Sequence, residues 1–218
     1  MFDYRAPAAM CVILLVTALY TFYQEASVFL FQPKDDKSFI TAVVQGNLPS
    51  PISSFSKSIV LEDCLVSMRS LYARLQPTKQ KLVHLKGCRD LALDITDKQP
   101  SFSAAWYVAA ASSGLLKDKT AFQVYFEKSY QTSTHEDWLS KRRFGLLIRH
   151  EDYQSERTQE ILRSDISTIL NSWNGTIWLA EQYIKHSFLR QLISDLVQLA
   201  KPKYQNMFLQ QVRKQSQQ

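Results

Sequence analysis

The chain has 218 residues, of which 45% are apolar and 21% charged, with a formal net charge of +6 and only five glycines. It contains no G-x-G-x-x-G, G-x-x-x-x-G-K-[ST] or G-x-S-x-G motif, so nothing supports a dinucleotide site, a P-loop or a nucleophile elbow. So few glycines also argue against a fold of many tight hairpins, and the charge is too low for a disordered chain. We therefore predict an all-α protein.

The N-terminal segment is apolar. Residues 6–23 (APAAMCVILLVTALYTFY) carry no charge, and as a helix they would span ~27 Å, close to the ~30 Å of a hydrocarbon core. We predict that residues 1–32 form an uncleaved membrane anchor. The alternatives are a signal peptide, for which Val16-Thr17-Ala18 is a poor cleavage site, and a core helix, which should have a polar face.

The orientation of such an anchor follows from the charges before it. Arg5 and the terminal amine would stay in the cytoplasm, so the rest of the chain would lie outside it. We accordingly expect a single-pass membrane protein whose C-terminal domain lies outside the cytoplasm.

Residues 33–58 are predicted to form a linker. The stretch 47–58 (NLPSPISSFSKS) is rich in proline and serine, which is typical of a connection between folded parts. Within this region Phe39–Val44 could be a short strand or a helix.

Two cysteines lie in a predicted helical hairpin. Ile59–Leu75 and Thr78–Ile95 both have helical patterns, and Gln76-Pro77 separates them. In an antiparallel hairpin about this break, Cys64 and Cys88 come to the same level, where a disulfide is geometrically reasonable. A disulfide would indicate an oxidising compartment; the alternative is two buried thiols.

Residues 59–200 are predicted to form a helical domain of about eight helices paired as αα-hairpins, because apolar residues recur at i, i+3, i+4 and i+7. Asn174-Gly175-Thr176 matches a glycosylation sequon, but such triplets often arise by chance, and we predict that it marks a turn between two of these helices. The stretch Pro100–Tyr130 resembles one tetratricopeptide (TPR) unit, with Trp106, Ala110, Ala121 and Tyr125 at the matching positions if one turn residue is deleted. The resemblance implies a TPR-like, α-α superhelix-like arrangement, although no second copy is clear.

A looser pattern covers more of the chain. The anchor, a cysteine, a proline-broken hairpin and a second cysteine are followed by P-x(3)-A-A-W from Pro100 to Trp106. After it come Ser129, Glu136, Trp138 and the pair Arg142-Arg143. This order resembles small TPR-like proteins associated with bacterial exopolysaccharide or surface-polysaccharide assembly. The resemblance implies an accessory or scaffolding role and no catalysis, and it implies an inner-membrane anchor with the C-terminal domain in the periplasm.

The sequence offers little that would support catalysis or metal binding. His135-Glu136-Asp137 and His150-Glu151-Asp152 are runs of adjacent residues, which point in different directions on a helix and rarely bind one metal. The first run is better explained as a helix N-terminus. His84 and Cys88 lie at i, i+4, but neither an oxyanion hole nor a substrate cleft can be identified for a catalytic thiolate. We therefore expect no enzyme activity, no metal and no cofactor.

Binding to other envelope proteins is the function that the sequence favours. Candidate partner-binding residues are Tyr107, the aromatic residue least aligned with a buried stripe, together with Trp138, Arg142 and Arg143. A solvated face is the alternative explanation for the arginines.

The C-terminal stretch 201–218 is basic. It holds Lys201, Lys203, Arg213 and Lys214 and no acidic residue. It could bind anionic lipid or an acidic polysaccharide, or fray as a soluble tail. Nucleic acid is a weak candidate, since no recognised binding motif accompanies the charge. The sequence therefore predicts a membrane-anchored, non-enzymatic scaffold, and as an alternative a basic peripheral binder of anionic lipid or acidic polymer.

Overall fold

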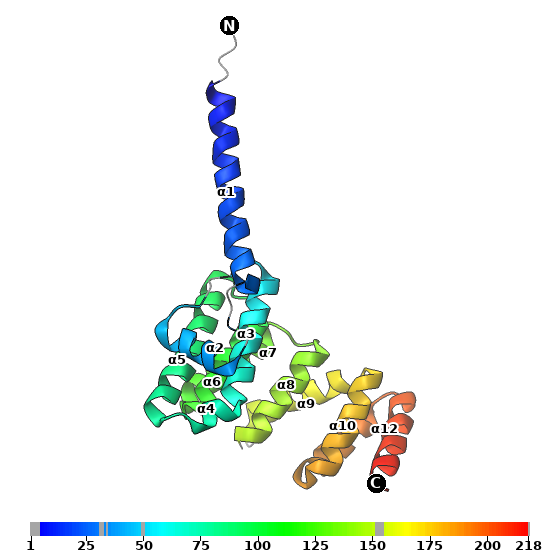
Figure 1. The fold of residues 1–218 in the computed structure, drawn as a ribbon. Coiled ribbons are helices and arrows are strands. Elements are labelled where there is room, and N and C mark those ends of the chain that lie inside the picture. Colours follow the sequence, from blue (N-terminus) through cyan, green and yellow to red (C-terminus); the bar gives the residue numbers. More distant parts are fainter. Residues whose placement is uncertain (1–4, 31–32, 34, 49–50, 151–154, 218) are drawn as a thin grey trace. The chain divides into compact units, whose positions relative to one another are not determined.

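The structure is a computed structural model, which describes the chain except for residues 1–4, 31–32, 34, 49–50, 151–154 and 218, and except for the side chains of residues 5–8 and 150. The described residues are helical and contain no strand, which confirms the all-α prediction (Figure 1). The α-helices are α1 (Arg5–Leu30), α2 (Asp36–Gln45), α3 (Ser54–Arg69), α4 (Leu71–Leu75), α5 (Thr78–Lys98), α6 (Ser103–Leu115), α7 (Lys119–Gln131), α8 (Asp137–His150), α9 (Glu156–Leu170), α10 (Trp173–Lys185), α11 (Arg190–Leu199) and α12 (Pro202–Gln215), with a 3₁₀ turn at Ser187–Leu189. The stretch 59–200, for which about eight helices were predicted, holds nine in its described residues, α3 to α11, and α4 among them is only five residues long.

The chain divides into two compact units, Met1–Tyr125 and Phe126–Gln218, which we call unit 1 and unit 2. Each is described by itself below.

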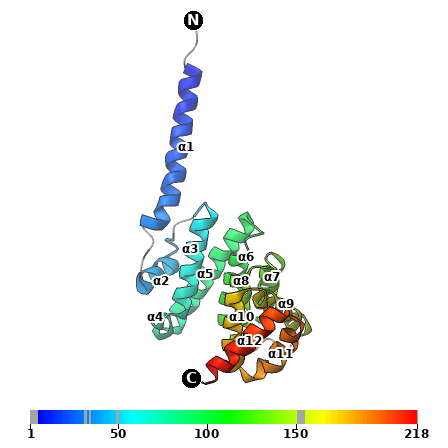
Figure 2. The same cartoon turned by 90° about the vertical axis from the view of Figure 1, so that its right-hand side faces the viewer.

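Helix α1 of unit 1 is the segment predicted as an anchor. Its stretch Ala9–Leu30 is long and apolar enough to cross a membrane, although a signal sequence would have the same character. Every side chain from Ala9 to Tyr23 is exposed, and only the C-terminal end of the helix lies beside α3 (Figures 1 and 2). A core helix is therefore ruled out for this stretch. The structure does not describe the terminal amine or the Arg5 side chain, whose charges were expected to orient the helix.

The rest of unit 1 is built around α6. Helices α3 and α5 pack against it, and Ala105, Ala109 and Ala110 are fully buried, which lets the helices approach closely. Helix α2 packs against α5 at Gly87, where an added Cβ would lie 2.5 Å from a methyl carbon of Val43. Small residues therefore set the helix spacing in this unit.

The predicted linker at 33–58 is largely folded. Phe39–Val44 is part of α2, so the helical alternative was right and the strand alternative wrong, and Phe39, Ile40 and Val43 are buried. Helix α3 starts inside the proline- and serine-rich stretch, because the Ser53 side chain caps it by accepting from the Ser56 N–H at 3.1 Å. Tertiary packing and a cap override a composition that is typical of a loop.

In unit 2, α8 packs against α9, and α10 packs against α9 and α12. Ser155 caps α9 and Ser172 caps α10. The turn predicted at Asn174-Gly175-Thr176 is instead the first turn of α10. Gly175 is needed there because an added Cβ would lie 2.0 Å from the Ile169 carbonyl oxygen.

The region predicted as one TPR unit forms the consecutive helices α6 and α7. Trp106 stacks on Tyr125 with 5.9 Å between ring centroids, so the two aromatic residues of the TPR pattern do meet. The TPR arrangement itself remains a prediction.

Candidate functional site

The end of α1 is attached to the start of α3 by hydrogen bonds. The Glu25 carboxylate accepts from the Ser53 backbone N–H at 3.1 Å and also from the Ser53 and Ser56 hydroxyls. Ser53 is the N-cap of α3, so the carboxylate lies at the positive end of that helix. Ser27 and Val28 of α1 are buried. The last turns of α1 are thus part of unit 1 and not an appended tail. We call this contact the α1–α3 junction.

The disulfide between Cys64 and Cys88 is formed, as predicted, with 5.8 Å between the Cα atoms. Both cysteines are completely buried. A catalytic thiolate would have to be free and accessible, and Cys88 is neither in this structure. The bond therefore acts as a structural crosslink between α3 and α5.

A buried histidine lies next to the disulfide. His84 Nε2 is 3.0 Å from the Ser67 hydroxyl and 3.7 Å from Cys88 Sγ, and His84 Nδ1 has no hydrogen-bond partner. Burial lowers the pKa of His84 to about 4 from its ordinary 6.5. Its imidazole is therefore neutral at physiological pH.

We expect this histidine to make unit 1 sensitive to acid. Because the folded-state pKa lies below the unfolded one, the unfolded chain binds the proton first as the pH falls. The contribution of His84 to stability, fully present above pH 6.5, should fall by about 3 kcal/mol towards pH 4. Hydrogen exchange over α3 and α5, measured on the full chain across this range, should show the fall, and His84→Gln should flatten it. An equal flattening by His135→Gln, at an exposed position, would contradict the assignment.

Two of the predicted partner-binding residues are buried, which corrects the prediction. Tyr107 is 1% exposed because α6 has neighbours on several sides, and its hydroxyl accepts from the Arg69 guanidinium at 3.4 Å. Arg143 is fully buried and ion-paired with Asp165, with N–O distances of 2.9 and 2.6 Å. Neither side chain can contact a partner in this structure.

Arg143 belongs to a polar cluster inside unit 2. It also donates to the Ser129 carbonyl oxygen at 3.2 Å and to the Ser140 hydroxyl at 3.3 Å, and its guanidinium lies 5.6 Å from the Tyr130 ring centroid. Burial raises the pKa of the Asp165 carboxyl, and the hydrogen bonds and charge of Arg143 oppose that rise. The burial of Arg143 could have been predicted from the sequence, because Leu139, Arg143 and Leu147 lie at i, i+4 and i+8 on one face of the helix.

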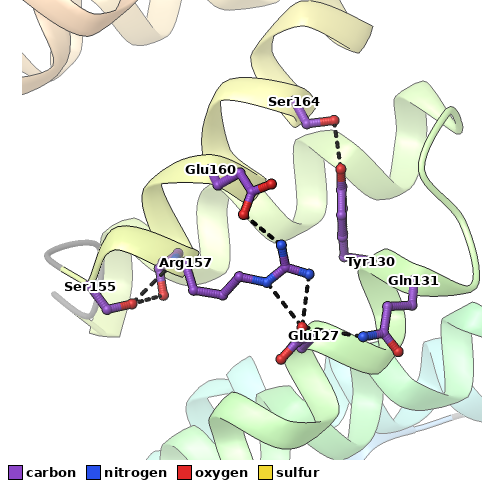
Figure 3. A network of polar contacts seen from close by, with 8 residues as sticks. Glu127, Tyr130, Gln131, Ser155, Arg157, Glu160 and Ser164 are labelled. Atoms are coloured by element: carbon purple, nitrogen blue, oxygen red, sulfur yellow. Dashed lines mark hydrogen bonds and ion pairs between the residues drawn. The ribbon is translucent and has the colours of Figure 1, made fainter.

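A second set of polar contacts joins α7 to α9 at the surface (Figure 3). The Arg157 guanidinium lies between Glu127, at 2.8 Å, and Glu160, at 2.6 Å, and the Tyr130 hydroxyl donates to Ser164 at 3.0 Å. No pattern in the sequence predicts this network. Exposed ion pairs of this kind contribute little to stability, so we expect this network to add little to the free energy of unfolding.

Trp138 and Arg142 remain as candidates for binding a partner. Trp138 is 47% exposed on the first turn of α8, and the Arg142 guanidinium lies 5.3 Å from its ring centroid. Beside them Lys141 pairs with Asp137 at 2.6 Å. A large exposed aromatic ring with an arginine on its face has the composition of a protein-binding hot spot.

The basic C-terminal segment is a packed helix and not a frayed tail. Met207 and Phe208 of α12 are buried, whereas Lys201, Lys203, Arg213 and Lys214 are exposed. A groove of about 300 Å³ runs between α10, α11 and α12. Its lining is mainly apolar and includes Tyr183, Val197, Phe208, Leu209 and Val212.

Among the described residues, no group of three His, Cys, Asp or Glu side chains is placed to hold a metal ion. Asp137 begins α8, so the run His135–Asp137 does mark a helix N-terminus, as predicted. The run His150-Glu151-Asp152 lies outside the side chains that the structure describes. Comparison with known protein families, with curated proteins and with solved structures found no match for this chain.

Proposed function

We propose that this protein is a single-pass membrane protein whose helical units bind other proteins of the bacterial envelope, outside the cytoplasm. The α1–α3 junction is the observation that carries the proposal. An apolar helix with exposed side chains along most of its length needs a non-aqueous environment, and the last turns of this helix are built into unit 1.

The junction also bears on whether α1 is cleaved. Removal of α1 after Tyr23 would take away the anchor but leave Glu25 on a frayed end, and removal after Val28 would expose α3. The buried positions of Ser27 and Val28 therefore favour a retained helix. The Cys64–Cys88 bond supports an oxidising compartment for unit 1.

The membrane part of the proposal is tested by extraction and topology. The full chain should stay in the membrane pellet after alkaline carbonate treatment and keep its N-terminus in mass spectrometry. A C-terminal alkaline phosphatase fusion should be active. Release by carbonate, or a mature N-terminus beyond residue 23, would contradict an uncleaved anchor.

The binding part of the proposal is placed on α8, at Trp138 and Arg142. The resemblance to polysaccharide-assembly proteins narrows the expected partners to complexes that assemble surface polysaccharide. A photo-crosslinking amino acid at position 138 should capture envelope proteins from membranes. Position 173 is a matched control, because Trp173 is also exposed and lies on α10. Equal capture at both positions would argue against a specific surface on α8, and no capture of envelope proteins would argue against the scaffold function.

The exposed cations of α12 favour a second candidate function, binding of anionic lipid or an acidic polymer. Each basic side chain near an anionic surface contributes ~1 kcal/mol. In full chain held in phosphatidylcholine nanodiscs, Lys201→Gln with Lys203→Gln should weaken binding to phosphatidylglycerol vesicles about 30-fold at low salt.

The control for this prediction has the same change in net charge. Lys79→Gln with Lys119→Gln alters two exposed lysines of unit 1 and should leave the affinity unchanged. Deleting residues 201–218 is a poor test, since it removes the buried Met207 and Phe208. Binding that does not depend on salt would count against this second function.

A further inference from the structure

Large apolar side chains are exposed around the α1–α3 junction. They come from two segments that are distant in sequence, the end of α1 and the start of α3. The Phe29 and Phe55 rings stack with 6.2 Å between their centroids. We call this set the collar, and its members, with the exposed fraction of each side chain, are Phe29 (48%), Leu30 (70%), Ile52 (49%) and Phe55 (68%).

The length of α1 gives the depth at which the collar would lie. If residues 6–23 fill the hydrocarbon core, Leu30 lies ~10 Å beyond Tyr23, at ~1.5 Å per residue. The headgroup region on each side of a bilayer is ~5–8 Å thick. Phe29 and Leu30 would then fall at or just beyond the outer edge of this layer, and Tyr20 and Tyr23 at its inner edge, where aromatic residues are enriched. If the longer apolar stretch Ala9–Leu30 fills the core instead, Phe29 and Leu30 themselves fall at the inner edge of the layer.

The junction brings α3 to the same depth. Ile52 and Phe55 flank the N-cap Ser53, and Ser53 and Ser56 are hydrogen-bonded to Glu25. These hydrogen bonds also satisfy a carboxylate that would otherwise lie unpaired beside the hydrocarbon, where that is costly. The junction thus explains two features together: the charged Glu25 near the end of the apolar α1, and the exposed apolar side chains at the start of α3.

We propose that the collar is a lipid-binding surface, which inserts into the interfacial layer of the bilayer and seats unit 1 directly on the membrane. The proposal rests on the proposed function in so far as α1 must be a membrane anchor. Lipid is the occupant because Phe29 and Leu30 of the collar end the stretch Ala9–Leu30, which is long and apolar enough to cross a membrane and is exposed from Ala9 to Tyr23. Interfacial insertion of aromatic and aliphatic side chains is the established way in which such a patch is removed from water.

The test places an environment-sensitive NBD fluorophore on a cysteine at position 55. The full chain with Cys11→Ser and Phe55→Cys is labelled and reconstituted in phosphatidylcholine nanodiscs, with or without lipid carrying a nitroxide near the headgroup. Cys11 is removed because it is the free cysteine of the native chain, and mass spectrometry should show one label and an intact Cys64–Cys88 bond. We expect a blue-shifted emission that is lost when the nitroxide lipid is included.

Two matched positions make the result specific. Leu75→Cys, at an exposed residue of α4 in the same unit, should emit as in water and show no quenching. Phe22→Cys, at an exposed residue of α1, should be quenched by a nitroxide on the lipid chain. Ile52→Cys repeats the measurement at a second collar position should Phe55→Cys fold poorly.

The outcomes separate the collar from the anchor. Quenching at positions 22 and 55 supports both. Quenching at position 22 with water-like emission at position 55 overturns the collar and leaves the anchor intact. No quenching at either position means that the proposed function has failed. A blue-shifted emission at position 55 without lipid quenching, together with energy transfer between labelled chains, means that a second copy covers the collar, which also overturns lipid binding.

Discussion

Replacing Arg143 by methionine is expected to lower the free energy of unfolding by about 3–5 kcal/mol, because it leaves the buried Asp165 carboxylate without its partner. Both side chains are fully buried and joined by two hydrogen bonds. The serine groups that also contact Arg143 would lose a donor at the same time. Thermal unfolding followed by circular dichroism, on full chain in nanodiscs, measures the loss.

The same variant should depend on pH in a defined direction. Burial raises the pKa of Asp165 and Arg143 opposes this, so its removal should raise that pKa further. A carboxyl with a higher pKa in the folded state than in the unfolded state holds its proton longer when folded, so stability falls as the pH rises between the two values. Arg143→Met should therefore be closer to the native chain at pH 4–5 than at pH 8.

Two further variants test the cause of this effect. Arg143→Met with Asp165→Leu removes both charges and should recover much of the loss. Arg157→Met breaks the partly exposed pairs with Glu127 and Glu160 and should change stability by about 0–1 kcal/mol. If Arg143→Met and Arg157→Met had equal effects, the pair in the core would not be a main contributor to unit 2.

The second large effect is expected from the disulfide. Cys64→Ala with Cys88→Ala removes a crosslink that spans 24 residues, and this should destabilise unit 1 by about 3 kcal/mol. Hydrogen exchange followed by mass spectrometry on the full chain should show faster exchange over α3 and α5. The loss arises mainly from the greater freedom of the unfolded chain, so it does not require a change in the folded packing.

Cys11→Ser is the matched control for this prediction, because Cys11 is exposed and outside the bond. It should leave exchange over α3 and α5 unchanged. A reductant should reproduce the effect of the double variant in the native chain once the unit is opened by mild denaturant, and it should have no effect on the double variant. Unchanged exchange in the double variant would contradict a stabilising role.

The features that the sequence predicts well are those set by local pattern. The apolar run at 6–23 predicts α1, and the break at Gln76-Pro77 predicts the antiparallel pair that brings Cys64 to Cys88. Each of these signals acts within one helix or between neighbouring helices, so no knowledge of the distant packing is needed.

The errors arise where distant packing decides the outcome. Helices form within the stretch predicted as a linker because α2 packs against α5 at Gly87, and the start of α3 is hydrogen-bonded to Glu25, some thirty residues away. Tyr107 was expected at the surface because it lies off the main apolar stripe, but α6 is surrounded and has no single buried face.

The two adjacent arginines show the same limit on a smaller scale. Arg142 lies over an exposed tryptophan and Arg143 is fully buried, although they are the same residue type in the same helix turn. The period of the apolar residues, and not the charge of the pair, distinguishes them. The partner of Arg143 is 22 positions away, and no spacing rule identifies it.

The α1–α3 junction also limits how far the protein can reach. A flexible tether of the length first predicted for residues 33–58 would let a domain explore about 25–30 Å above the bilayer. Because Glu25 is hydrogen-bonded to Ser53 and Ser56, the start of α3 is held at the end of α1 and has no such freedom. If α1 is the anchor proposed above, a partner that binds unit 1 beside the α1–α3 junction would meet it close to the lipid headgroups.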